Sequence, residues 1–219
     1  MSKLFAIKQD FTLMAILLIP IAVAVNFVGG SLALALKLPL YLDSIGTFIV
    51  AMLAGPWVGG VTGFLSLLGV SITDPTSLPW AVLAALVGVV VGTLARGKMF
   101  LTWGRIISSI GIIVLVSVAL VVIMRFLFFG GFTTSGSSLV AAAMMTAGMP
   151  FWFAQVLSSI VSEIPDKTIT VLIAVFVIRS ISTRTLLKFG TGSIFAEYRT
   201  ARKAKKKAAA TPVAAGTTN

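Results

Sequence analysis

Long stretches without a charged residue constrain this 219-residue chain more than any other feature. A helix that crosses a membrane needs about 20 consecutive residues without an unpaired charge. Charged residues make up 11% of the chain and hydrophobic residues 58%, whereas roughly a quarter of a soluble domain is charged. The uncharged runs cover residues 11–36, 44–73, 75–95, 106–124, 126–162 and 168–178. We therefore expect an all-α, multi-pass membrane protein.

The chain contains no cysteine and no histidine, which excludes several kinds of catalytic and metal site. Disulfides, thiolate nucleophiles, zinc fingers and imidazole acid–base pairs all need those residues. Residues 92–99 match the glycine-rich phosphate loop except at the end, where Met99 replaces the Ser or Thr that holds magnesium. That segment also follows an apolar helix and not a strand. We therefore expect a protein with few chemically active side chains, no nucleotide bound through this loop, no cofactor and no metal site.

The uncharged run over residues 44–73 is too long for a single crossing. Its 30 residues would form a helix of about 45 Å, against a hydrocarbon core of about 30 Å. Gly55 and Pro56 interrupt it, and proline favours the first turn of a helix over its interior. We predict two short spans, residues 40–54 and 56–70, with one tilted and kinked helix as the alternative.

Basic residues predict the orientation, because Lys and Arg concentrate in short cytoplasmic loops. Lys3 and Lys8 lie at the N-terminus, and nine basic residues against the single acid Glu197 follow from residue 179 onward. Both ends are therefore expected in the cytoplasm, which requires an even number of spans. Besides the first run and the two short spans, we predict spans at residues 80–95, at 106–129 and ending near 187. The prediction is six transmembrane helices.

Two further segments, residues 22–24 and residues 137–162, allow more than one interpretation. Residues 22–24 resemble a signal-peptide cleavage site, but the apolar run continues to residue 36, which favours an uncleaved span. Residues 137–162 are apolar, yet a full crossing there would put the basic tail outside. We expect one or two re-entrant or half-depth helices on the outer side, broken at residues 148–150. Residues 1–190 would form the membrane domain.

Residues 191–219 are predicted to form a disordered, basic cytoplasmic tail. Juxtamembrane basic clusters bind anionic lipid at about 1 kcal/mol per charge. No aromatic residues interleave the lysines of this tail, so a nucleic-acid partner is disfavoured.

Ionisable residues collect at the predicted outer ends of the spans. Arg125 lies one turn inside such an end, where an unpaired charge costs about 2.5 kcal/mol or more. It therefore needs Glu163, Asp166 or a substrate anion as its partner. Asp43, Asp74 and Asp166 have a structural alternative, since each could stabilise a helix N-terminus. Lys37 and Lys167 are expected on the same side.

Aromatic residues gather on that side too. An interfacial belt is the structural explanation. Trp152 and Gln155 occupy adjacent turns, however, and could stack on and hydrogen-bond to a flat ligand. Phe132 is also expected among the aromatic residues at the outer side. The predicted substrate-binding residues are Tyr41, Asp43, Asp74, Trp80, Arg125, Phe129, Trp152, Gln155, Glu163, Asp166 and Lys167.

Small residues recur at helical spacing along three predicted spans. They are Ala15, Ala22 and Gly29; Gly55, Gly59 and Gly63; and Ala84, Gly88 and Gly92. Such stripes let membrane helices approach closely. Packing within the chain accounts for two of them, and the stripe at Ala15, Ala22 and Gly29 is the candidate partner interface.

Three segments resemble the substrate-binding S component of energy-coupling-factor (ECF) vitamin transporters. They are LPLYLDSIGTFIVAMLAGPWVGGVTGFLS (38–66), DPTSLPWAVLAALVGVVVG (74–92) and EIPDKTITVLIAVFVIRSI (163–181). The resemblance runs in order from about residue 10 to residue 187. Its most specific parts are LDSIGT with the GPWVGG turn, and DKTITV. Many members carry two alanines four residues apart on the first helix, whereas here Ile19 follows Ala15 and Asn26 follows Ala22.

The resemblance implies a six-helix protein with both ends cytoplasmic, in a bacterial or archaeal plasma membrane. It implies capture of a vitamin-like small molecule from outside, and docking on a membrane-embedded coupling (T) subunit powered by two ATPase subunits. Because these partners hydrolyse ATP, the resemblance also implies that this chain has no enzymatic activity. A membrane sensor domain, or a self-sufficient channel or secondary transporter, is the alternative. A proton- or sodium-coupled carrier would be expected to show an ionisable residue at mid-membrane, which the predicted spans lack.

Overall fold

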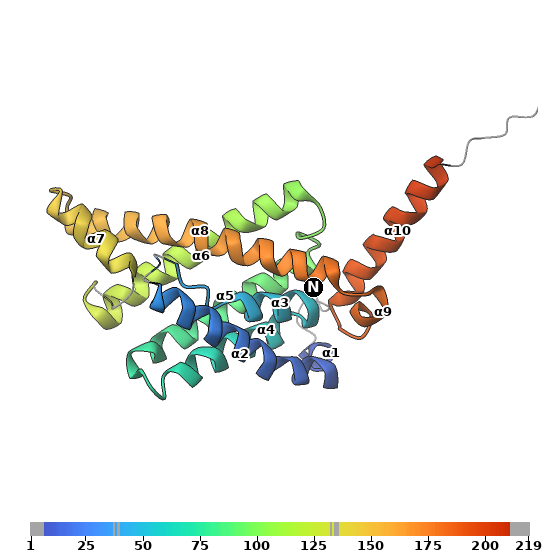
Figure 1. Cartoon of the computed structure of the whole chain (residues 1–219), viewed down its shortest axis with the longest axis horizontal. Coiled ribbons are helices and arrows are strands. Elements are labelled where there is room, and N and C mark those ends of the chain that lie inside the picture. The colour runs from blue at the N-terminus through green and yellow to red at the C-terminus, as the bar shows by residue number, and fades with distance from the viewer. Residues whose placement is uncertain (1–6, 37, 39, 132, 134–135, 211–219) are drawn as a thin grey trace, which may run out of the picture.

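The computed structural model describes residues 7–36, 38, 40–131, 133 and 136–210, and over these residues the chain forms helices and connections but no strand (Figure 1). The predictions for Lys3, Lys37, Phe132 and residues 211–219 lie outside this part. The longer helices are α2 (Leu13–Ala35), α3 (Ile45–Ala54), α4 (Pro56–Val70), α5 (Leu78–Arg96), α6 (Trp103–Phe129), α7 (Gly136–Thr146), α8 (Phe151–Ser180) and α10 (Gly192–Ala210). Short helices are α1 (Ile7–Asp10), η1 (Pro75–Ser77) and α9 (Thr183–Leu186).

Three helices in the described part of the chain are long and apolar enough to cross a membrane: Leu13–Ala35, Pro75–Arg96 and Trp103–Phe129. Much of their surface is apolar and exposed, as expected for helices whose solvent is lipid. α3, α4 and α7 are shorter apolar helices. The prediction of a helical, membrane-associated protein is therefore confirmed.

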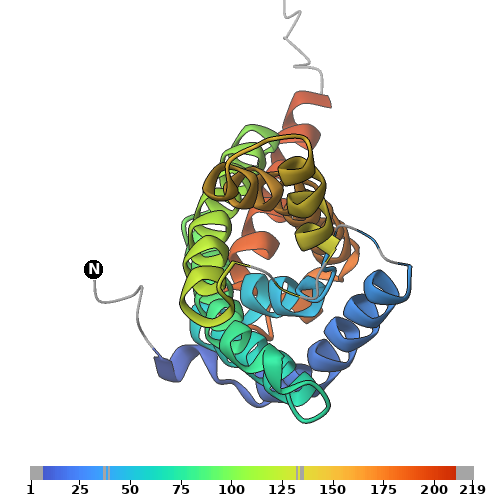
Figure 2. The same ribbon diagram turned by 90° about the vertical axis from the view of Figure 1, so that its left-hand side faces the viewer.

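The helices of the bundle run back and forth between two ends (Figure 1). α1, α9, α10 and the α5–α6 connection gather at one end, which we call the tail end. The α4–α5 and α6–α7 connections lie at the opposite end, which we call the pocket end. Seen from the pocket end, α3 lies inside a ring made by α2, α4, α5, α6 and α8 (Figure 2).

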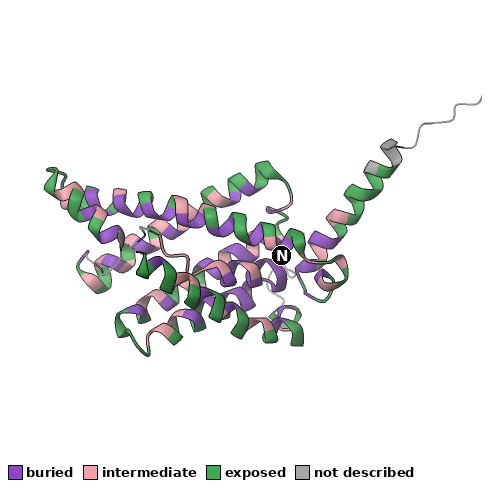
Figure 3. Cartoon of the chain, in the orientation of Figure 1, coloured by how far each residue is buried: buried purple, intermediate pink, exposed green. Residues whose placement is uncertain are grey.

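α3 is the centre of the core. Every residue from Gly46 to Ala54 is buried except Ile49 (Figure 3). A helix that is apolar on all sides has no face to give to water, and this one packs against α2, α4, α5 and α8. It begins at Ile45, five residues after the predicted start of the span.

The predicted break at Gly55 and Pro56 is confirmed, so the single kinked helix is wrong. α3 ends at Ala54, α4 begins at Pro56, and Gly55 has φ of 116°, a conformation that favours glycine. Asp10 stabilises the break, because its carboxylate accepts a hydrogen bond from Trp57 N at 3.3 Å and pairs with Arg96. Burial raises the pKa of the Asp10 carboxyl, and the Arg96 charge opposes this.

All three small-residue stripes pack inside the chain, which corrects the predicted partner interface. Ala15 and Ala22 are buried, and a β-carbon on Gly29 would collide with the Leu42 carbonyl. Ala22 meets Gly46 of α3, so this stripe seats α2 on α3 and the 36–44 connection. The other two stripes face each other across α4 and α5, the most extensively packed pair of helices.

α8 corrects the prediction for residues 137–162. The break at residues 147–150 is present, but the segment after it is not a separate half-depth helix: it continues without interruption into the last predicted span. Pro165 lies inside this helix and does not end it. At 1.5 Å per residue, its 30 residues reach about 45 Å. Asp166 is therefore mid-helix and does not cap an N-terminus.

The prediction of disorder from residue 191 is wrong for residues 192–210, which form α10. Phe195 and Ala196 are buried, and the Arg199 guanidinium donates hydrogen bonds to three carbonyls at the end of α8, those of Ile178, Arg179 and Ile181. A cation at a helix C-terminus satisfies carbonyls that have no partner within the helix. Beyond Arg199, the helix extends away from the bundle (Figure 1).

Candidate functional site

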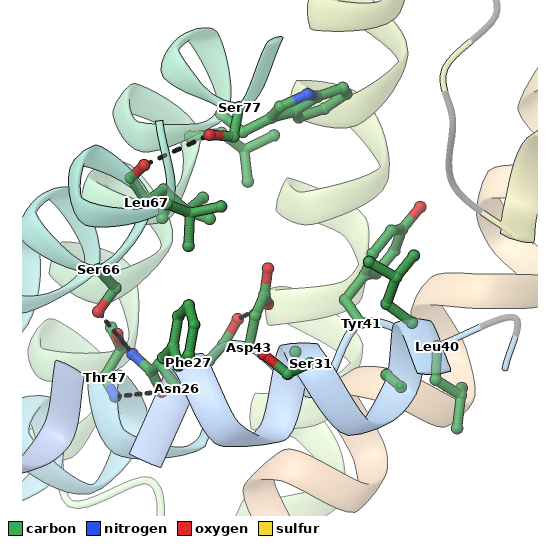
Figure 4. A pocket seen from close by; sticks show the side chains of 18 of the residues that line it. Asn26, Phe27, Ser31, Leu40, Tyr41, Asp43, Thr47, Ser66, Leu67 and Ser77 are labelled. Atoms are coloured by element: carbon green, nitrogen blue, oxygen red, sulfur yellow. Dashed lines mark hydrogen bonds between the residues drawn. The ribbon is translucent and has the colours of Figure 1, made fainter. Parts of the chain in front are cut away.

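A cavity of about 740 Å³ opens at the pocket end (Figure 4). Its walls come from α2, α3, α4, α5, α6, α7 and α8, and from described residues of the connections at 36–44, 71–77 and 130–136. Six of the predicted substrate-binding residues line it: Tyr41, Asp43, Asp74, Trp80, Glu163 and Lys167. This volume suits a ligand of drug or vitamin size.

Asn26 fixes one wall of the cavity from within α2. Its amide nitrogen donates to Thr47 Oγ1 and Ser66 Oγ, both at 2.8 Å, and its oxygen accepts from Gly46 N at 2.7 Å. These bonds join α2, α3 and α4 through one buried side chain. Gly46 N is an otherwise orphaned donor in the first turn of α3, so Asn26 also caps that helix.

The charged wall of the cavity lies on α8, where Lys167 pairs with two carboxylates. The Lys167 ammonium lies 2.7 Å from Asp166 Oδ2 and 3.5 Å from Glu163 Oε2, and all three side chains are buried. The other Asp166 oxygen accepts hydrogen bonds from the backbone of Tyr41 at 3.0 Å and of Leu42 at 2.9 Å. Asp166 therefore lies behind the cavity wall and holds the 36–44 connection against α8.

Asp43 projects from that connection into the cavity, between Leu67 and Tyr41 in Figure 4. Its carboxylate accepts a hydrogen bond from the Ser44 hydroxyl at 2.8 Å. Burial raises the pKa of the Asp43 carboxyl, while the Lys167 charge acts in the opposite direction.

Arg125 is buried, but the predicted carboxylate partners are wrong. Glu163 and Asp166 pair with Lys167 instead. The Arg125 guanidinium is held by neutral groups: Gln155 Oε1, Ser158 Oγ, Ser159 Oγ, Tyr41 OH and Ser137 Oγ. Arg125 does not line the cavity, but Tyr41 and Ser137 do. It therefore acts on the cavity indirectly, by fixing two residues of the wall.

Trp80 and Asp74 belong to the rim. Trp80 stacks on Phe129 with ring centroids 5.4 Å apart and planes 10° apart, so Phe129 supports the cavity wall without lining it. Asp74 is exposed, and it caps η1 by accepting from Thr76 N at 3.1 Å. The predicted capping role of Asp74 is confirmed.

Trp152 lies away from the cavity, contrary to the stacking role predicted for it. It is 65% exposed and packs against Phe126, with ring centroids 4.2 Å apart. Gln155, one turn further along α8, is buried beside Arg125. The two residues face different directions because helical neighbours three residues apart still diverge by about 60° at 3.6 residues per turn.

Sequence reasoning missed Asn26 and the inward polar face of α8. That face carries Ser158, Ser159, Ser162 and Thr170 in addition to the predicted residues. A signal for both was available: Asn26 is a lone amide in an apolar run, and the polar residues of α8 recur every three or four positions. In the described part of the chain, no group of acidic residues is arranged to hold a metal ion.

Comparison of the chain with protein-family models, with curated proteins and with solved structures finds no match. The function is therefore argued from the cavity and from the residues that line it.

Proposed function

We propose that this chain is the solute-capture subunit of an ATP-driven importer, equivalent to the S component of an ECF transporter. In this proposal it has six membrane spans, both ends lie in the cytoplasm, and the pocket end faces outward from a bacterial or archaeal plasma membrane. The chain carries no enzymatic activity of its own. A membrane-embedded coupling subunit and two ATPase subunits supply the energy.

One observation carries the proposal: a vitamin-sized cavity at one end of the bundle stands above a closed, apolar core. The α3 residues Val50 to Ala54 are all buried and apolar. They follow Thr47 and Phe48 of the cavity wall and lead to the tail end, where the Leu53 carbonyl accepts a hydrogen bond from Thr191 N at 3.0 Å. A channel or secondary transporter needs polar or ionisable groups along its path. A chain that binds at one end and is packed below it suits capture, with release left to a partner.

Reconstitution tests this function. Liposomes that hold the chain alone should bind the co-purifying small molecule without accumulating it. Addition of the coupling subunit and both ATPases should give uptake that depends on ATP. Uptake by the chain alone, without ATP, would instead establish a self-sufficient carrier.

The basic side of α10 supports a second contact. Arg202, Lys203, Lys205 and Lys207 are exposed on a helix that leaves the bundle at the tail end. In the proposed orientation they lie beside the cytoplasmic leaflet, where anionic lipid headgroups attract Lys and Arg.

A further inference from the structure

We propose that the cavity selects an organic cation: a solute with a protonated amine or quaternary ammonium nitrogen beside a flat apolar part. The inference rests on the capture function proposed above and narrows its substrate class. It depends on the balance of charge in the inner wall, on one buried carboxylate oxygen that accepts no hydrogen bond, and on the aromatic walls.

The inner wall holds an excess of negative charge. Three carboxylates share this wall with one ammonium: those of Glu163 and Asp166 pair with Lys167, and that of Asp43 lines the same cavity. Asp43 and Glu163 face the cavity, and Asp74 adds a further carboxylate at its rim. Charges in a membrane-embedded site are costly unless they are paired, so the unmatched carboxylates call for a cation.

The cationic residues nearby are not available to an anion. Lys167 is committed to Asp166 and Glu163 at 2.7 and 3.5 Å. Arg125 lies outside the lining of the cavity, behind the hydroxyls of Tyr41 and Ser137. A carboxylate or phosphate ligand would therefore meet Asp43 and Glu163 without a free positive charge to bind it.

Glu163 supplies the independent observation. It is 1% exposed and lines the cavity, and its Oε2 lies 3.5 Å from the Lys167 ammonium but accepts no hydrogen bond from any described residue. A buried carboxylate oxygen without a donor is unfavourable unless a ligand or water supplies one. A protonated amine in the cavity would provide a hydrogen-bond donor and a further positive charge, and a quaternary ammonium would provide the charge.

Aromatic rings provide the rest of the site. Phe27, Tyr41 and Trp80 line the cavity, and Phe129 supports the Trp80 ring from behind. Aromatic faces attract organic cations and stack on flat ligands. The carboxylates and the rings thus select for two parts of the same molecule.

Matched probes test the charge preference on the full chain in detergent. The probes are benzyltrimethylammonium, benzyl alcohol and phenylmethanesulfonate, which share a ring and differ in charge. Binding is measured by calorimetry and by the shift in thermal unfolding. We expect the cation to bind at least about tenfold more tightly than the other two, which corresponds to about 1.4 kcal/mol. Equal binding of the three probes, tighter binding of the anion, or binding of none would overturn the proposal.

Variants locate the site. Asp43→Asn and Glu163→Gln should each weaken binding of the cation by about tenfold. Glu197→Gln, at an exposed acid of α10, is the matched control and should leave it unchanged. Unchanged binding in both cavity variants would place the cation elsewhere and refute the inference. The comparison of probes on the unaltered chain decides the charge preference even if a variant does not fold.

The same preparations separate this inference from the proposed function. A neutral or anionic small molecule that co-purifies in the cavity would leave capture intact and refute only the charge preference. A cavity that carries no small molecule and binds none of the three probes would count against both.

Discussion

Single side chains hold this cavity together more than backbone geometry does. Asn26 joins three helices, Asp166 anchors the 36–44 connection, and Arg125 fixes Tyr41 and Ser137. Each is a buried polar group in an apolar bundle, where a satisfied hydrogen bond is strong and an unsatisfied one costly. The polar residues therefore specify which arrangement of the helices is stable.

Asn26→Leu should lower the free energy of unfolding by about 2 kcal/mol or more, because it removes the hydrogen bonds that Asn26 makes to Thr47, Ser66 and Gly46 N. Thermal unfolding in detergent measures the change. Ser108→Ala is the control, since Ser108 is exposed and bonds only to a carbonyl of its own helix. A loss no larger than that of the control would show that Asn26 does not hold the helices together.

Protonation of Asp43 should control cation capture. A raised pKa brings protonation of this carboxyl closer to neutral pH than its ordinary value of 3.8, and the protonated form cannot pair with a cation. Affinity for benzyltrimethylammonium, whose charge does not depend on pH, should therefore fall as the pH is lowered below neutral. Lys167, Asp166 and Glu163 face the same group and shape the curve.

Calorimetry across that pH range checks the dependence. Asp43→Asn should flatten the curve as well as lower the affinity. An identical pH profile in this variant would assign the titration to another group.

At the scale of helices, the sequence predicted features that depend on local backbone geometry. It did not predict features that depend on contacts with distant segments. Gly55 and Pro56 end and start helices by their own backbone geometry, so the α3–α4 break could be predicted. The charges of α8 resembled the end of a span, but Glu163, Asp166 and Lys167 are buried because they pair with one another and with the backbone of another segment. No pattern within α8 reveals those partners.

The residues that line the cavity could be predicted only in part. Tyr41, Asp43, Trp80, Glu163 and Lys167 stood out by residue type near the ends of spans, and all line it. Trp152 stood out equally and faces away, because the direction of a side chain depends on the rotation of its helix. The docked part of α10 was missed because its contacts are with the distant carbonyls of α8.

The contact between α4 and α5 depends on glycine. A β-carbon on Gly88 would lie 2.5 Å from the Gly59 carbonyl oxygen, so Gly88→Ala should force the helices apart and cost roughly 1–3 kcal/mol. Gly111→Ala is the matched control, because a β-carbon on Gly111 in α6 meets no atom within 4 Å. Alanine there should be neutral or slightly stabilising. Equal thermal stability of the two variants would contradict close packing of α4 on α5.

The two ends of the molecule differ in character. A charged and aromatic cavity lies at one end, and the α5–α6 connection, with Arg96, Lys98 and Arg105 in or beside it, lies with basic α10 at the other. The proposed orientation puts these ends on opposite sides of the membrane. Because the chain has no cysteine, a single introduced cysteine reports on one position. Ile72→Cys, at the pocket end, should react with an impermeant reagent on intact cells, whereas Thr102→Cys, at the tail end, should react only after lysis. Labelling of Thr102→Cys from the medium would contradict the proposed orientation and show that the tail end faces outward.

Capture of a small molecule in the 740 Å³ cavity is the central claim, and native mass spectrometry of the detergent-solubilised chain tests it most directly. Ser31 lines the cavity from an exposed position on α2, so Ser31→Trp should obstruct the cavity without disturbing the core. Ser108→Trp, on the exposed surface of α6, is the control. The unaltered chain and the control should each carry one small molecule that the Ser31→Trp variant lacks. A chain that carries none, or a variant that retains it, would contradict capture at this site.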